Sequence, residues 1–209
     1  MGIPIEVPGL NTIIPELGDG RLVVVESGAD PAKSFFVRTL SLSALRAGRP
    51  VTWITSRDRT ELRDQLVTEG ALAPWDESNP LILEKDAVPD LEPYGQPGGL
   101  LAVDSFSFLT LDLGGSRVAT MLRGIRALCH DRKTTVVLAT DRGMFEPRAE
   151  AVSSHLADGV IQFHAKEGPE GLIRYLRIPK WTDGRFMDRN VYYEFDGRRI
   201  AVDLRSRVL

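Results

Sequence analysis

The stretch Arg21-Leu-Val-Val-Val-Glu-Ser-Gly-Ala-Asp-Pro-Ala-Lys-Ser-Phe-Phe36 decides the fold. Its apolar, β-branched run leads into a short loop, and the loop opens into a helical pattern at Lys33 and Ser34. A strand, a tight turn and a helix N-terminus in this order form an anion site, because free backbone N–H groups and the helix dipole favour negative charge. The stretch therefore predicts a phosphate-binding loop. Its expected nucleotide-binding residues are Gly28, Ala29, Asp30, Pro31, Ala32, Lys33, Ser34 and Phe35.

This loop departs from the phosphate-loop consensus at several positions. The consensus has one glycine six positions before the lysine and another directly before it, and this chain has Ser27 and Ala32 there. Pro31 has no N–H group to donate to a phosphate. Asp30 adds a negative charge beside the expected polyphosphate, which is repulsive unless the side chain turns away or binds a cation. Together these changes predict weak phosphate binding.

The rest of the chain alternates short apolar runs with amphipathic stretches. This pattern predicts an α/β fold with a mostly parallel sheet covered by helices on both faces. The expected strands are 21–26, 50–55, 81–83, 100–104, 134–139 and 159–163, and the expected helices are 32–47, 59–67, 116–131 and 147–156. Three further strands, 172–178, 190–195 and 199–202, follow without helices and predict an antiparallel extension of the sheet. The length predicts one domain over residues 1–209.

Composition limits the classes of function. The net charge of −3 gives no support to nucleic-acid binding, although arginine outnumbers lysine and leaves a local basic face open. Cys129 is the single cysteine, which excludes an internal disulfide and a cysteine-based zinc site, and we expect it to be a packed small residue. No apolar run reaches the length of a membrane span and the N-terminus does not resemble a signal peptide, so we expect a soluble, cytoplasmic protein.

Polar residues follow three of the expected strands. Lys33 and Ser34 follow the first, Asp104 follows 100–103, and Thr140 with Asp141 follow 134–139. Because the carboxyl ends of parallel strands meet at one edge of the sheet, this pattern predicts a site for ATP and Mg²⁺. Lys33 would meet the β- and γ-phosphates, Ser34 and Asp104 would hold the ion, and Thr140 and Asp141 would act as sensors of the γ-phosphate. The alternative is that these residues are ordinary helix caps and turn residues.

Four stretches carry a resemblance to a known family. They are the phosphate loop, Pro8-Gly-Leu-Asn-Thr-Ile-Ile-Pro-Glu-Leu-Gly-Asp-Gly20, Leu101-Ala-Val-Asp-Ser-Phe-Ser-Phe108, and an ending that runs from Leu156-Ala-Asp-Gly-Val-Ile161 through Arg177-Ile-Pro-Lys-Trp181 to Tyr192-Tyr-Glu-Phe-Asp-Gly197. In this order the chain resembles the ATPase domain of the RecA superfamily, in its KaiC-like branch, which includes archaeal RadA paralogues. The resemblance implies a RecA-like fold, ATP and Mg²⁺ as ligands, and partners that are copies of the chain or paralogous RecA-like subunits.

The resemblance also implies catalytic residues that this chain replaces. The family has paired glutamates after its second strand, where this chain reads Thr55-Ser-Arg-Asp-Arg59. Asp58 is the carboxylate left to act as catalytic residue, because Arg57 cannot accept a proton. The family's Lys-x-Arg, which reaches a neighbouring subunit's γ-phosphate, is represented by Lys180 with Thr182 in the arginine position, and Arg185 is the nearest replacement. These replacements imply at most a weak ATPase.

Three functions remain open at this point. The first is a nucleotide-gated regulatory or assembly module that binds ATP–Mg²⁺ and turns it over slowly or not at all. The second is a pseudo-ATPase that serves as a protein-interaction subunit of a ring, filament or heteromeric complex. The third is a recombination or repair accessory factor that binds single-stranded DNA. The third depends on arginines that are also explained as a solvated basic tail, namely Arg185, Arg189, Arg198, Arg199, Arg205 and Arg207.

Overall fold

The structure is a computed structural model, and it describes residues 2–28, 30–68, 81–88, 90–169, 171–182 and 187–204. The helices are α1 (Leu10–Ile13), α2 (Ala32–Arg46), α3 (Arg59–Thr68), α4 (Phe106–Leu109), α5 (Gly115–Arg132) and α6 (Pro147–Leu156), with a 3₁₀ turn at Glu92–Tyr94. The strands are β1 (Ile3–Pro4), β2 (Glu16–Leu17), β3 (Leu22–Ser27), β4 (Val51–Thr55), β5 (Leu81–Glu84), β6 (Leu100–Val103), β7 (Thr135–Asp141), β8 (Gly159–Gly168), β9 (Gly171–Trp181), β10 (Met187–Phe195) and β11 (Ile200–Asp203).

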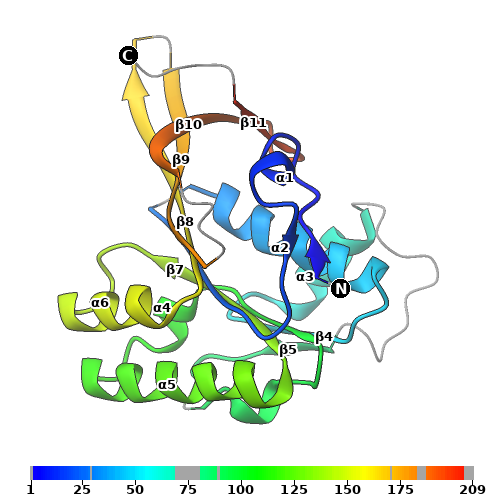
Figure 1. The fold of residues 1–209 in the computed structure, drawn as a ribbon, viewed down its shortest axis with the longest axis vertical. Helices are drawn as coiled ribbons and strands as arrows, with labels where there is room; N and C mark the ends of the chain where they lie inside the picture. The colour runs from blue at the N-terminus through cyan, green and yellow to red at the C-terminus, as the bar shows by residue number, and fades with distance from the viewer. Residues whose placement is uncertain are drawn as a thin grey trace.

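Within the described residues, the main sheet has nine strands in the order β11-β10-β9-β8-β3-β7-β6-β4-β5. The six strands from β8 to β5 in this order are parallel. The last three strands of the chain add to the β8 edge as antiparallel neighbours. Figure 1 shows these late strands extending the sheet away from the helices that cover its parallel part. The predicted α/β class and the antiparallel C-terminal extension are confirmed.

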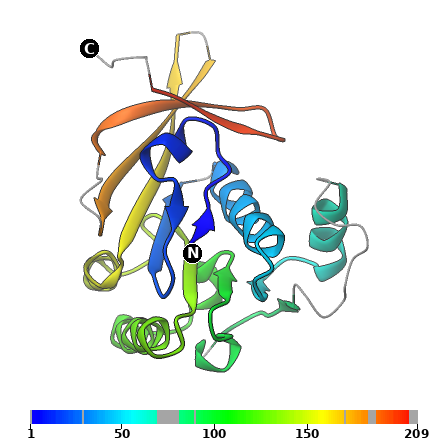
Figure 2. The same cartoon turned by 45° about the vertical axis from the view of Figure 1, so that its right-hand side comes forward.

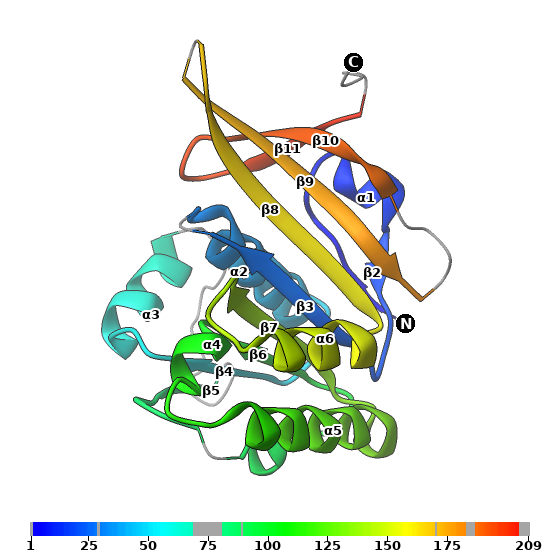
Figure 3. The ribbon, with the colours of Figure 1, turned by 90° about the vertical axis from the view of Figure 1, so that its left-hand side faces the viewer.

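The sheet separates two apolar layers, because successive side chains of a strand point to opposite faces. On β6, Leu100 and Ala102 pack with α2, whereas Leu101 and Val103 pack with α5. Figure 3 shows α4, α5 and α6 on one side of the parallel strands and α2 on the other. Burial on both faces explains why β3, β6 and β7 read as nearly continuous apolar runs.

The order of the strands places the phosphate loop (residues 27–34) at a change of direction. The chain leaves β3 through α2 and crosses over β7 and β6 to reach β4. It later passes from β7 through α6 to β8, on the opposite side of β3. Such a switch point opens a crevice at the carboxyl ends of the strands, which is where ligands of open α/β sheets bind.

The N-terminal segment covers one edge of this arrangement. Figure 2 shows it folded over α2 and beneath the C-terminal strands. Gly9 has a left-handed φ of 81°, and a Cβ there would lie 2.1 Å from the carbonyl oxygen of Val202 on β11. The neighbouring Pro8 carbonyl accepts the N–H of Val202 at 2.9 Å. The Pro-Gly turn therefore allows the N-terminal segment to approach β11 closely.

Most predicted elements lie within a few residues of the observed ones, and α6 spans the predicted range 147–156. Three features were not predicted: the two-stranded sheet of β1 and β2, the short helix α4, and the lengths of β8 and β9. The two strands are longer because they pair with each other beyond the end of β3, where exposed polar residues hide the apolar alternation. Among the described residues, no helix is long and apolar enough to cross a membrane.

Candidate functional site

Three strand ends bring the predicted site residues together. Ser27, the last residue of β3, pairs with Asp141, the last residue of β7. On the other side of β7, Val103 pairs with Leu138, so Asp104 follows directly at the same edge. Helix α2 begins at Ala32 and therefore starts at this edge as well. The prediction that these residues share one edge of the sheet is thus consistent with the topology.

Lys33 is buried and is paired with a carboxylate of the chain itself. It is 4% exposed, and its Nζ lies 2.5 Å from Oδ1 of Asp141. The Ser107 hydroxyl donates to Oδ2 of Asp141 at 2.9 Å, and it accepts the backbone N–H of Asp141 at 2.9 Å. Asp141 is therefore held by Ser107 and serves as the counter-ion of Lys33. A phosphate that approached Lys33 would compete with this carboxylate.

Ser107 reaches Asp141 because the chain turns sharply after β6. Ser105 takes a left-handed conformation with a φ of 59°, which is uncommon for a residue with a Cβ atom. The turn leads directly into α4, which contains Ser107. Sequence analysis did not select Ser107, although it lies in the quoted motif that ends at Phe108, because its role depends on this turn.

Ser34 and Asp104 form the part of the site that is suited to a metal ion. The Ser34 hydroxyl donates to Oδ1 of Asp104 at 3.1 Å, and Asp104 is 3% exposed. Hydroxyl and carboxylate oxygens are the hard donors that Mg²⁺ prefers, so this pair fits the predicted ion. Arg57 lies on the other side, with its Nε 3.8 Å from Oδ2 of Asp104. Within the described residues, no group of three or more His, Cys, Asp or Glu side chains is arranged to hold a metal by itself.

Asp30 turns back onto the start of α2. Its Oδ1 accepts the backbone N–H of Ala32 at 2.8 Å, and its Oδ2 lies 3.1 Å from Nε of Arg174 on β9. The Asp30 side chain is only 3% exposed. One of the N–H groups that a phosphate would use is therefore bonded to a carboxylate of the same loop, and this carboxylate is neutralised by Arg174. Sequence analysis did not identify Arg174, since its contact with Asp30 spans 144 positions along the chain.

The other predicted site residues, in the phosphate loop and outside it, have varied surroundings. Gly28 and Pro31 line a cavity beside the loop. The Phe35 ring packs against Phe195, with 5.5 Å between the ring centroids. Thr140 is buried and pairs with Glu26 of β3. Ala29 and Arg185, which were also predicted to belong to the site, lie outside the described residues.

Asp58 and Lys180 bond to helix ends in this structure. Oδ1 of Asp58 accepts the backbone N–H of Glu61 at 2.9 Å, which caps the first turn of α3. The Lys180 ammonium donates to the carbonyl oxygens of Ser154 at 3.0 Å and of His155 at 2.7 Å, near the C-terminus of α6. Their predicted roles in catalysis and across a subunit interface stay predictions.

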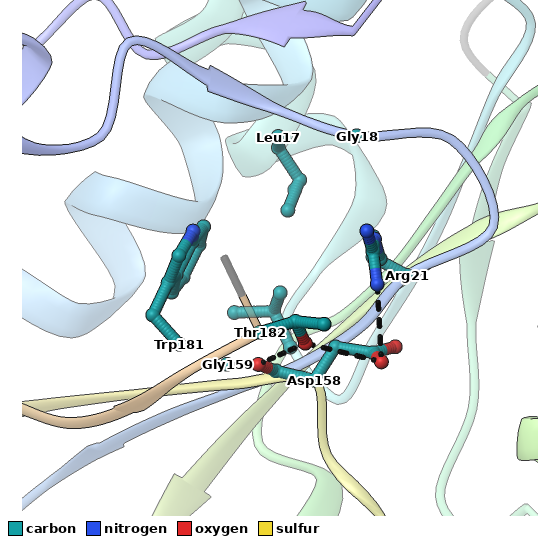
Figure 4. A pocket seen from close by; sticks show the side chains of 8 residues that line it. Leu17, Gly18, Arg21, Asp158, Gly159, Trp181 and Thr182 are labelled. Atoms are coloured by element: carbon teal, nitrogen blue, oxygen red, sulfur yellow. Dashed lines mark hydrogen bonds and ion pairs between the residues drawn. The ribbon is translucent and has the colours of Figure 1, made fainter. Parts of the chain in front are cut away.

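A small pocket lies at the opposite ends of the strands, near the start of β3. Its free volume is about 10 Å³, enough for no more than a single water molecule. Figure 4 shows Asp158 at its base, bonded to Arg21 and Thr182. Asp158 also accepts the backbone N–H of Leu22 at 2.9 Å and pairs with Arg126. This cluster joins β3, α5 and the residue that follows β9, and we interpret it as structural.

Two other titratable groups are shifted by their surroundings. Burial raises the pKa of the Cys129 thiol to about 12, so the thiol stays protonated at neutral pH, and Cys129 is completely buried. Burial also raises the pKa of Tyr193, and the nearby Asp30 carboxylate raises it further. Neither group is available as a nucleophile, and the prediction that Cys129 is a packed residue is confirmed.

Comparison with solved structures identifies the fold. A KaiC-like protein from the hyperthermophilic archaeon Pyrococcus horikoshii superimposes with a TM-score of 0.75 and 18% sequence identity, over 97% of this chain and 99% of that chain. The fold is KaiC-like. No protein-family model and no curated protein sequence matches the chain. The likeness establishes the RecA-like arrangement of the sheet, while the identity is too low to transfer an activity.

Proposed function

We propose that the chain is a RecA-like nucleotide-binding domain that binds ATP–Mg²⁺ weakly and acts as a regulatory or assembly module. The observation that carries the proposal is the Ser34–Asp104 hydrogen bond of 3.1 Å beside the buried Lys33. A buried lysine, a hydroxyl and a carboxylate at neighbouring strand ends are the groups that a nucleotide–metal complex requires. The KaiC-like fold supports the same reading, because ligands of open α/β sheets bind at the carboxyl edge of the strands.

In this proposal, each residue has a distinct role. Ser34 and Asp104 would hold Mg²⁺, which would supply charge neutralisation to the phosphates. Lys33 pairs with phosphate after it leaves Asp141, its present partner. Ser107 keeps Asp141 oriented when Lys33 pairs with the phosphate.

Turnover is expected to be slow because neither Asp58 nor Asp141 is free to activate a water molecule. Asp58 caps α3 and Asp141 is paired with Lys33. Arg57 lies near Asp104 on the β4 side, and a guanidinium group has no acceptor for a proton. The chain would therefore respond to nucleotide binding more than to hydrolysis.

A second function, a pseudo-ATPase that serves as a protein-interaction subunit, is favoured by the contacts of Asp30. The carboxylate bonds to the Ala32 N–H and to Arg174, so one N–H group at the start of α2 is satisfied without a ligand. Lys33 is likewise neutralised within the chain. A site that is complete in this way can persist as part of a stable fold whose function is assembly with a second copy or a paralogous RecA-like subunit.

The two functions are separated by measuring ATP–Mg²⁺ affinity by calorimetry, with phosphate release followed in the same samples. We expect measurable binding with negligible turnover, and loss of binding in Lys33→Ala. Arg123→Ala, which removes a cation from the exposed side of α5, is the matched control and should bind as the wild type does. Absence of binding at millimolar ATP would overturn the first function. Sedimentation equilibrium of the same protein would then test assembly.

A further inference from the structure

A cavity of about 650 Å³ lies between the phosphate loop and the β8–β9 hairpin. It exists because β3 pairs with β8 only as far as Gln162, whereas β8 continues to Gly168 in partnership with β9. Figure 3 shows this hairpin projecting past the end of β3. The volume is in the range of sites that hold small molecules. Lys33, Ser34 and Asp104 are not among the residues that line it.

Two guanidinium groups enter the cavity from different elements. Arg142 comes from the loop after β7, and Arg174 comes from β9. Among the described residues of the lining, Asp30 is the single carboxylate, and it is bonded to Arg174 and to the Ala32 N–H. Within the described residues, Arg142 makes no ion pair, so the lining carries one positive charge in excess.

The partner of Arg142 is a histidine rather than an acid. Nη1 of Arg142 lies 3.1 Å from Nδ1 of His164, whose ring stacks on Tyr175 with 4.7 Å between centroids and an interplanar angle of 4°. Burial lowers the pKa of His164, and the nearby Arg142 and Arg177 lower it further, so the imidazole is neutral at neutral pH. A neutral partner orients the guanidinium without cancelling its charge. Arg142 therefore remains able to bind an anion.

Apolar groups complete the lining of the cavity. Phe163 is buried and Leu172 is 50% exposed, and both line the cavity. A ligand that suits the lining has an anionic group for the guanidiniums and an apolar or ring-shaped part for these apolar groups. A dianionic, tetrahedral group can accept hydrogen bonds from guanidiniums on two sides, whereas a single carboxylate is planar and carries one charge.

We propose that this cavity is a binding site for a phosphorylated small molecule, with Arg142 and Arg174 as the counter-ions of its phosphoryl group. The site shares Gly28, Asp30 and Pro31 with the phosphate loop, but it does not include Lys33, Ser34 or Asp104 and needs no metal ion. His164 is a positioning residue that holds Arg142 at the cavity. The proposal does not depend on ATP binding at the phosphate loop.

Calorimetry with inorganic phosphate, on the full chain in the presence of a metal chelator, tests the site. We expect binding that weakens by about tenfold or more in Arg142→Gln, because the phosphate would lose a charge-assisted hydrogen bond. Arg123→Gln is the control for the same change of net charge and should have no effect. Lys33→Ala should bind phosphate as the wild type does, which separates this site from the nucleotide site.

Three results would overturn the proposal. One is the absence of phosphate binding at millimolar concentration. Another is a loss of binding in Lys33→Ala with Arg142→Gln unaffected, which would assign the anion to the phosphate loop. The third is acetate binding as tightly as phosphate, which would assign a carboxylate ligand instead. A shift of the His164 imidazole resonances on addition of phosphate would support the location, because the ring contacts Arg142.

Discussion

Asp30 offers the sharpest test of how this chain treats a nucleotide. A phosphate that accepts the Ala32 N–H must first displace the Asp30 carboxylate, which holds that N–H at 2.8 Å. A hydrogen bond to a charged group contributes about 1.5–3 kcal/mol. Since each 1.36 kcal/mol is a factor of ten, Asp30→Ala should tighten ATP–Mg²⁺ binding by about 10- to 150-fold. Asp30→Asn keeps an oxygen acceptor but removes the charge, so its gain should be smaller.

The same substitution should lower the free energy of unfolding. Arg174 loses its carboxylate partner, and its side chain is only 25% exposed. Because Arg174 keeps partial access to water, we expect a loss of about 1–3 kcal/mol, below the cost of breaking a fully buried pair. Asp30→Ala should therefore make the protein less stable and, at the same time, make it bind ATP–Mg²⁺ more tightly.

Calorimetric affinity and urea unfolding, measured on the same preparations, give both quantities. Asp131→Ala, at the end of α5 with a side chain 72% exposed, is the control for removal of one negative charge. The reasoning is refuted if both Asp30 variants bind ATP–Mg²⁺ no better than the wild type while Asp30→Asn remains folded. That outcome would mean that the carboxylate does not compete for the site.

Two further predictions concern stability and reactivity. Asp158→Ala should lower the free energy of unfolding by about 2–4 kcal/mol, because it leaves the Leu22 N–H and Arg126 without their buried acceptor. Chemical denaturation measures this loss. A change below about 0.5 kcal/mol, the size typical of a surface substitution, would contradict the prediction. Cys129, completely buried and with a pKa raised to about 12, should not react with a thiol reagent in the native protein at mildly alkaline pH and should react fully in denaturant. Rapid labelling of the native protein would contradict the buried, protonated state.

Much of the fold could be predicted from local patterns. The apolar runs of β3, β6 and β7 and the helical spacing of α2 and α5 are properties of neighbouring residues, and each was assigned close to its observed bounds. The order of strands and helices implied a parallel sheet, because right-handed crossovers allow few alternatives. The β8–β9 hairpin was underestimated, since its outer half is stabilised by cross-strand pairing between exposed residues.

The sequence by itself determined which residues reach the carboxyl edge of the sheet. Lys33, Ser34 and Asp104 follow strands and Asp141 ends one, so the topology alone brings them together. Only the tertiary structure decided which charges pair there: Lys33 with Asp141, and Asp30 with Arg174. These partners are 108 and 144 positions apart, and the choice among several acids and arginines depends on side-chain direction and burial. A local pattern carries no information about either, because both arise when distant strands meet.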